Sequence, residues 1–194
     1  MKRTHNLPVS ENVNKTLMGI AKKMGGGQVQ VGFLSDSPLG TYPNGVPVAA
    51  AMFWAEYGHE GQFPAPPRPY FRTMIAQESP TWGGKMAQLA KFTNYDGKRV
   101  LALLGEDIAA ALQESIVNYS GVPLAASTLI LRKKFWTNRD QIKRGDVVAA
   151  IEAAARGEEG ATGTQAKPLV WTGQALRDVG YKVNSEATVL PERA

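Results

Sequence analysis

The sequence has no cysteine among its 194 residues, and it has only two histidines, His5 and His59. Without thiols the chain can form no disulfide, thiolate zinc site, iron–sulfur cluster or cysteine nucleophile, and it fits synthesis in a reducing cytoplasm. Two histidines also exclude a histidine-rich metal site. A chain of this length buries roughly 70% of the surface that it exposes when unfolded, so we expect it to fold without disulfides or metal.

Long apolar runs are also absent. No stretch approaches the roughly 18 consecutive apolar residues of a membrane span, and the charged residues 1–6 are not followed by the apolar segment of a signal peptide. We therefore expect a soluble protein with no membrane partner. The net charge of +5 is a mild excess that bears on partners more than on fold.

Motifs of catalysis are missing as well. No Gly-x-Ser-x-Gly is present, and Gly25-Gly26-Gly27 precedes a predicted strand, whereas a phosphate-binding loop follows a strand and opens a helix. Glu56, His59 and Glu60 lie close together in the sequence, but their spacing is specific neither for acid–base catalysis nor for a metal site. We predict a protein that is not an enzyme, with no catalytic residues, no metal and no cofactor.

The periodicity of apolar residues predicts the main elements. Apolar residues recur with a helical period over 7–24, where Ser10 is the expected N-cap, over 48–57, and over 98–118, which we expect to be the longest helix. Alternation predicts strands over 28–34 and 180–183. We predict an α+β fold, in which a small, mostly antiparallel sheet packs against three to four helices.

Prolines and glycines divide the rest of the chain. Residues 58–69 are rich in proline and should be stiff and extended, and the segment that opens at Tyr70 should break or kink at Ser79-Pro80. Thr172 is the expected N-cap of a short helix that runs to residue 179.

One region differs from the rest in composition. Residues 135–166 combine basic residues, an alanine-rich piece expected to be helical, and the stretch 157–164, which has almost nothing to bury. We predict that residues 1–134 and 167–194 form a single α+β domain and that 135–166 is a partly flexible insertion into it.

Basic side chains are concentrated near the start of that region. They are Arg132, Lys133, Lys134, Arg139, Lys143 and Arg144, with Asp140 as the single acid among them. One interpretation is contact with DNA or with an acidic partner, in which Trp136 could also stack on bases. The other interpretation is a solvated arm without a ligand. Trp54, Trp82 and Trp171 lie outside the run and read as core or interface aromatics.

Several short blocks follow one another along the chain. They are Val31-Gly32-Phe33, Tyr42-Pro43-Asn44-Gly45, Glu56-Tyr57-Gly58, Pro66-Pro67-Arg68-Pro69-Tyr70-Phe71-Arg72, and Pro168-Leu169-Val170-Trp171-Thr172-Gly173-Gln174-Ala175-Leu176. Their order and spacing resemble the tail-completion or neck family of tailed bacteriophages. The resemblance covers the chain to residue 76 and residues 167–183 well, and residues 98–132 loosely. Two features depart from it: Trp171 stands where members often have an acid or a small polar residue, and members usually lack the insertion.

The resemblance implies a structural virion protein at the head–tail junction, made in the cytoplasm of the host bacterium. Such a protein would assemble with itself into a ring, expected to be a hexamer, which completes the tail and joins it to the head. Its partners would be the head-side connector and the tail terminator or tail tube protein, and it could touch genomic DNA in the lumen. The alternatives are the tail terminator ring itself, a non-specific DNA-binding module, and a hydrolase, for which we find no polar constellation.

The proline-rich block is the predicted contact surface of this ring. A stiff loop loses little entropy when an interface immobilises it, and arginine reaches carboxylates or carbonyls through several hydrogen bonds. The predicted interface residues are Phe63, Pro66, Pro67, Arg68, Pro69, Tyr70 and Arg72. The alternative is that Arg68 and Arg72 hold the loop to their own domain.

Overall fold

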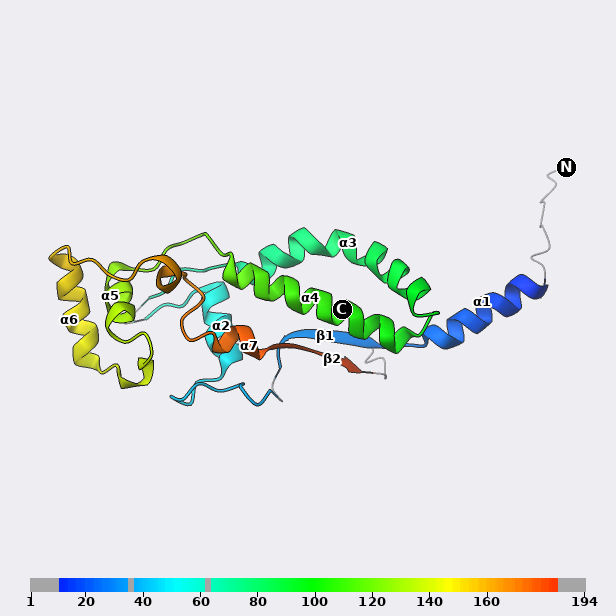
Figure 1. The fold of residues 1–194 in the computed structure, drawn as a ribbon, viewed down its shortest axis with the longest axis horizontal. Coiled ribbons are helices and arrows are strands. Elements are labelled where there is room, and N and C mark those ends of the chain that lie inside the picture. The colour runs from blue at the N-terminus through cyan, green and yellow to red at the C-terminus, as the bar shows by residue number, and fades with distance from the viewer. Residues whose placement is uncertain (1–10, 35–36, 62–63, 185–194) are drawn as a thin grey trace. The chain divides into compact units, whose positions relative to one another are not determined.

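The structure is a computed structural model, and it describes residues 11–34, 37–61 and 64–184 (Figure 1). The elements are α1 (Glu11–Met24), β1 (Gln28–Phe33), α2 (Val48–Tyr57), α3 (Tyr70–Phe92), α4 (Gly97–Val117), α5 (Ala126–Lys134), α6 (Arg144–Ala155), α7 (Gln174–Asp178) and β2 (Val179–Asn184), with 3-10 turns at Arg139–Gln141 and Gly163–Ala166. The predicted α+β class is confirmed. The described residues form more helices than the three to four that we expected around the sheet.

The sheet consists of β1 and β2, which pair antiparallel. The two strands come from opposite ends of the chain and lie side by side in Figure 1. Both were expected from the sequence, because alternating apolar residues mark a strand with one covered face. The predicted N-cap of α1, Ser10, lies outside the described residues.

Helix α3 departs from the expectation. It has 23 residues against 21 in α4, and it continues through Pro80, where we expected a break or kink. A proline inside a helix removes one hydrogen bond and crowds the preceding turn, at a cost of about 3 kcal/mol. Met74 and Ala90 are buried on either side of Pro80, so the helix is packed both before and after the proline.

The chain divides into two compact units. Unit 1 comprises 1–30, 81–105 and 182–194, and unit 2 comprises 31–80 and 106–181. The predicted insertion, 135–166, lies wholly inside unit 2 and is not a compact body of its own.

In unit 1 the N-terminus of α4 lies directly on the end of α1. A Cβ atom at Gly97 would lie 1.8 Å from the carbonyl oxygen of Met24, so only glycine fits there. The Asp96 side chain accepts the backbone N–H of Arg99 at 3.1 Å and so caps the new helix. Helix α1 keeps much of its apolar face in solvent, with Leu17 56% and Met18 73% exposed.

The core of unit 2 is built by three helices. It contains Val48 and Met52 of α2, Tyr70 and Met74 of α3, and Ile108, Leu112 and Ile116 of α4. The four-residue spacing within each helix places these side chains on one face. Among the hydrogen bonds that join the helices, the Tyr70 hydroxyl donates to the carbonyl of Met52 at 3.2 Å, and the Ser115 hydroxyl donates to that of Tyr70 at 2.7 Å.

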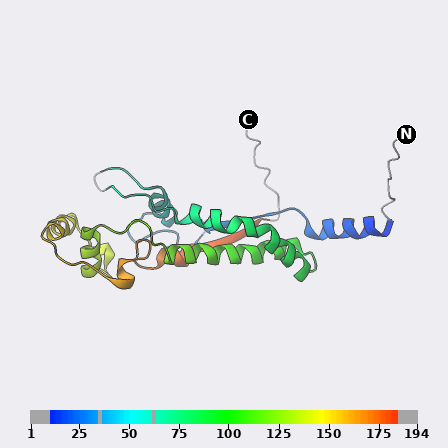
Figure 2. The ribbon, with the colours of Figure 1, turned by 90° about the horizontal axis from the view of Figure 1, so that it is seen from above.

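Residues 135–166 fold back onto α5. Figures 1 and 2 show α6, the expected alanine-rich helix, packed beside α5. The following stretch returns to the same helix, where the Ala161 N–H donates to the carbonyl of Leu129 at 2.9 Å. Ala161 is buried, so the expectation that 157–164 buries almost nothing is wrong at this residue. Gly160 permits the approach, because a Cβ there would come within 2.4 Å of the Leu129 side chain.

Candidate functional site

Helix α2 presents an exposed row of aromatic side chains. Val48, Met52 and Glu56 face the core, whereas Phe53, Trp54 and Tyr57 are 58%, 46% and 51% exposed. We call the last three the α2 aromatic face. The rings of Phe53 and Tyr57 lie 4.7 Å apart, one helical turn from each other. A helix that is apolar on all sides is normally buried all round, so this face is typical of a contact surface.

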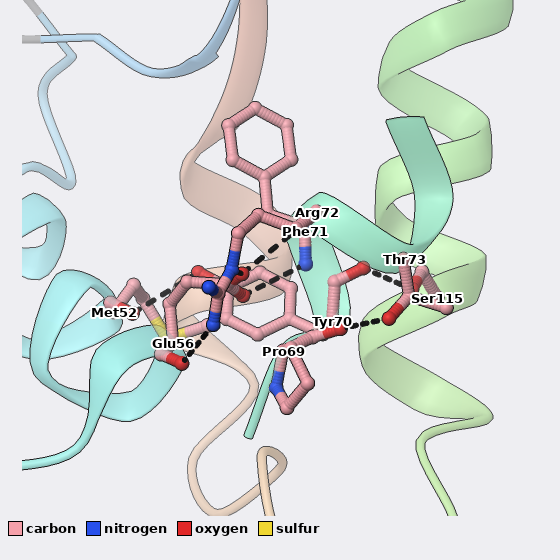
Figure 3. Close-up of polar contacts among 8 residues, drawn as sticks. All are labelled: Met52, Glu56, Pro69, Tyr70, Phe71, Arg72, Thr73 and Ser115. Atoms are coloured by element: carbon pink, nitrogen blue, oxygen red, sulfur yellow. Dashed lines mark hydrogen bonds and ion pairs between the residues drawn. The ribbon is translucent and has the colours of Figure 1, made fainter. Parts of the chain in front are cut away.

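The end of α2 is tied to the start of α3 through Glu56 (Figure 3). Its carboxylate accepts the backbone N–H of Phe71 at 2.9 Å and that of Arg72 at 3.2 Å. The Nε of Arg72 donates to the same carboxylate at 2.8 Å. Pro69 precedes the helix and offers no capping side chain, so Glu56 supplies from another helix the acceptor that the α3 N-terminus needs.

Arg72 extends the aromatic face. Its side chain is 52% exposed, and its guanidinium lies 4.6 Å from the centre of the Tyr57 ring. The Arg72 side chain is thus exposed enough to make the predicted interface contact, which stays a prediction. The same residue also holds Glu56, as the alternative expected.

Arg68 and Tyr70 require a correction. Both are buried, Arg68 at 8% and Tyr70 at 2% exposure, so neither presents a free contact surface. The guanidinium of Arg68 donates to the carbonyls of Val122 and Pro123, each at 3.2 Å. Burial lowers the pKa of Arg68. Arg68 therefore holds the loop to its own chain.

The prolines of the loop are more open. Pro66 and Pro67 are exposed and Pro69 is half-buried, while Phe63 lies outside the described residues. The loop begins at Gly58, the C-cap of α2. Gly58 has a φ of 76°, and a Cβ there would lie 2.7 Å from the carbonyl oxygen of Ala65. Position 58 therefore requires glycine both for its positive φ and for the close approach of the Ala65 carbonyl.

The block Tyr42–Gly45 meets the block near the C-terminus. A tight turn closes with the Gly45 N–H donating to the carbonyl of Tyr42 at 2.9 Å. The side-chain amide of Gln174 donates to the carbonyls of Leu39 and Thr41, both at 2.9 Å. Gly173, with a φ of 70°, is the N-cap of α7 in place of the expected Thr172. The block near the C-terminus is therefore hydrogen-bonded to the segment that leads into the Tyr42–Gly45 turn.

The basic residues do not form one surface. Arg132 is 4% exposed, and its guanidinium donates to the carbonyls of Gln165, Lys167, Pro168 and Val170 at 2.6–3.3 Å. The side chain binds the segment 165–170 of its own chain, so the prediction that Arg132 contacts DNA or an acidic partner as an exposed residue is wrong. Arg139 is half-buried against aromatic rings.

The remaining basic residues are exposed, and two of them bind within the chain. Lys134 pairs with Asp146 at 3.0 Å, and the Lys133 ammonium donates to the carbonyl of Glu159 at 3.2 Å. Lys143 and Arg144 lie at the start of α6 and are exposed to solvent. For these residues, contact with DNA or an acidic partner stays a prediction.

The other residues considered for chemistry are dispersed. Glu56 is buried and engaged with α3, whereas His59 and Glu60 are exposed. In the described parts of the chain, no group of three or more His, Cys, Asp and Glu side chains is placed to hold a metal ion. No helix of those parts is long and apolar enough to cross a membrane.

Comparison with known proteins identifies no relative. No family model, no curated protein and no solved structure matches this chain.

Proposed function

We propose that this chain is a structural protein of the phage neck, which assembles with itself into a ring at the head–tail junction of the virion. The ring, expected to have six subunits, completes the tail and joins it to the head-side connector on one side and to the tail terminator or tail tube on the other. The protein acts by binding and has no catalytic role.

The α2 aromatic face carries this proposal. Phe53, Trp54 and Tyr57 expose apolar surface, and burying it against another subunit would be favourable. Each fully buried aromatic side chain removes about 150–250 Å² from water. Aromatic residues and arginine are enriched at the energetic centres of interfaces, and Arg72 borders this face.

The resemblance to the neck family supports the same function. In unit 2, Glu56 of one block binds the start of α3 in the next, and Gln174 of the last block binds the Leu39–Thr41 backbone just before the Tyr42–Gly45 block. The Glu56 bonds hold the end of α2 to the start of α3, and the Gln174 bonds hold the segment that leads into the Tyr42–Gly45 turn. That arrangement suits a protein whose interface must be rigid before assembly.

The oligomeric state tests the self-association step. Analytical ultracentrifugation should find an oligomer of the wild-type chain, and electron micrographs of it should show rings. The double variant Phe53→Ser/Tyr57→Ser should weaken association by about 100-fold or more, which corresponds to about 3 kcal/mol. The matched control is Val148→Ser/Ile151→Ser, which removes apolar side chains of similar exposure from α6. A wild-type chain that stays monomeric at high concentration would refute the ring.

The position in the virion needs a separate test. Because the chain has no cysteine, Thr162→Cys, at an exposed position, gives a single site for a gold label. Label at the head–tail junction of particles supports the neck function. Particles without label, with the protein only in the lysate of infected cells, would contradict it and would favour the DNA-binding alternative.

A further inference from the structure

Two arginines of unit 2 gather around one aromatic ring. The guanidinium carbon of Arg132 lies 5.0 Å from the centre of the Trp171 ring, and that of Arg139 lies 5.1 Å from the same centre. Arg139 also lies 5.0 Å from the centre of the Tyr42 ring. Within the described part of the chain, no carboxylate forms an ion pair with either guanidinium. We call these four residues the arginine cluster.

The two guanidinium groups of the cluster place like charges close together. Burial, and to a smaller extent the nearby charges of Arg139 and Arg68, lower the pKa of Arg132 to about 10. Placing two cations together away from water is unfavourable unless anions or acceptors compensate them. The carbonyls that bind Arg132 supply part of this compensation, but they carry no net charge.

A cavity of about 150 Å³ lies against the cluster. Arg132, Arg139, Tyr42 and Trp171 all line it. The Nε of Arg132 is buried and has no hydrogen-bond partner among the described residues. A buried donor without an acceptor costs about 1–3 kcal/mol, so the hydrogen bonds of the described residues satisfy the Arg132 guanidinium only in part.

We propose that the arginine cluster is a binding site for an oxyanion, namely a carboxylate or a phosphate group. Guanidinium groups bind both through charge-assisted hydrogen bonds of matching planar geometry. The cavity exceeds the roughly 30 Å³ that a water molecule occupies in the liquid, so it accommodates an anionic group of several atoms. A second cavity of about 330 Å³ also borders Arg139, on the side of Pro43 and Ile142, and offers room for the remainder of a larger ligand. This site is independent of the neck function.

Calorimetric titration of the full chain tests the site. The probes are sodium phosphate and sodium acetate, each at an ionic strength held constant with sodium chloride. We expect saturable binding of at least one of them, with affinity reduced tenfold or more in Arg139→Gln and less in Arg139→Lys. The matched control is Arg144→Gln, which removes the same charge from an exposed position of the basic run and should change the affinity by less than twofold.

The two probes distinguish the natural sources of the anion. Preference for phosphate indicates a free phosphate or a phosphate ester, and preference for acetate indicates the carboxylate side chain of a protein partner. Absence of saturable binding by the folded wild-type chain would overturn the proposal. Equal loss in Arg139→Gln and Arg144→Gln would also overturn it, since that result reports a diffuse basic surface. If Arg139→Gln fails to fold, unchanged affinity in Arg139→Lys serves as the refuting result.

Discussion

Replacing Glu56 by glutamine tests how the chain holds α2 against α3. The substitution keeps the shape of the side chain but turns one of its two acceptor oxygens into a donor. In the wild-type chain, the Glu56 carboxylate accepts hydrogen bonds from the backbone N–H groups of Phe71 and Arg72 and from the Nε of Arg72. Glutamine has a single acceptor oxygen, which can replace either the one that binds Phe71 or the one that binds Arg72. At least one N–H at the start of α3 therefore loses its acceptor.

The expected loss follows from burial. Glu56 is 3% exposed, so water cannot replace the missing acceptor. A hydrogen bond to a charged group contributes about 1.5–3 kcal/mol, and a carboxylate at a helix N-terminus adds a favourable interaction with the helix dipole. We expect Glu56→Gln to lower the free energy of unfolding by about 2–4 kcal/mol. With a urea m-value of about 2 kcal/mol/M, this is a shift of about 1–2 M in the midpoint.

Urea unfolding, followed by circular dichroism below the concentration at which the chain self-associates, measures this loss. Glu60→Gln is the matched control, because the same chemical change at an exposed position should stay within about 0.5 kcal/mol. Arg72→Gln separates the two functions of Glu56. The side chain of Arg72 is 52% exposed, so its ion pair should contribute about 1 kcal/mol or less. If Arg72→Gln costs as much as Glu56→Gln, the capping argument is refuted.

Three further changes address other parts of the fold. Gly97→Ala should destabilise the chain by more than about 2 kcal/mol, because its Cβ would collide with the Met24 carbonyl. Gly84→Ala, in an open part of α3, should be neutral or stabilising, and thermal unfolding compares the two variants. Arg132→Gln should cost about 3 kcal/mol or more in urea unfolding, against about 0.5 kcal/mol or less for Arg144→Gln. Burial raises the pKa of Tyr70, so above pH 10 the unfolded chain releases the phenolic proton while the folded chain keeps it. The free energy of unfolding is therefore unaffected by this group below pH 10 and falls as the pH rises above 10. Tyr70→Phe should therefore lose less stability between pH 10 and 12 than the wild type does in a series of urea titrations.

Local patterns in the sequence predict most of the elements, and tertiary packing decides the exceptions. Periodicity identifies both strands and helices such as α2 and α4, because burial of one face selects apolar residues at a fixed spacing. The course of the chain at Pro80 is different. Whether a proline ends a helix depends on the packing beyond it, and local sequence carries no information about that packing.

The sequence predicts the helix α2, but it indicates neither the exposed aromatic face nor the function of Glu56. An apolar run without a polar side predicts a helix buried all round, and the structure leaves half of it in solvent. The only signal for Glu56 is indirect: α3 follows Pro69 and has no Ser, Thr, Asp or Asn at its start, so its N–H groups need an acceptor from elsewhere. The sequence does not say which acid supplies it.

The basic residues show why a count of charges is a poor guide to partners. Neighbours in the sequence, Arg132 and Lys133, differ completely in the structure, because a helix turns each successive side chain by about 100°. One is buried against carbonyls of residues 165–170, and the other is exposed. Arg139 then joins Arg132 at the same ring, although it lies beyond the end of that helix. The fold thus separates a run that looks uniform into a buried clamp, a cluster suited to an oxyanion and a few solvated side chains. The exposed side chains of the last group are the ones free to approach phosphates, so neutralising Arg144 should remove more of any salt-dependent DNA binding than neutralising the half-buried Arg139.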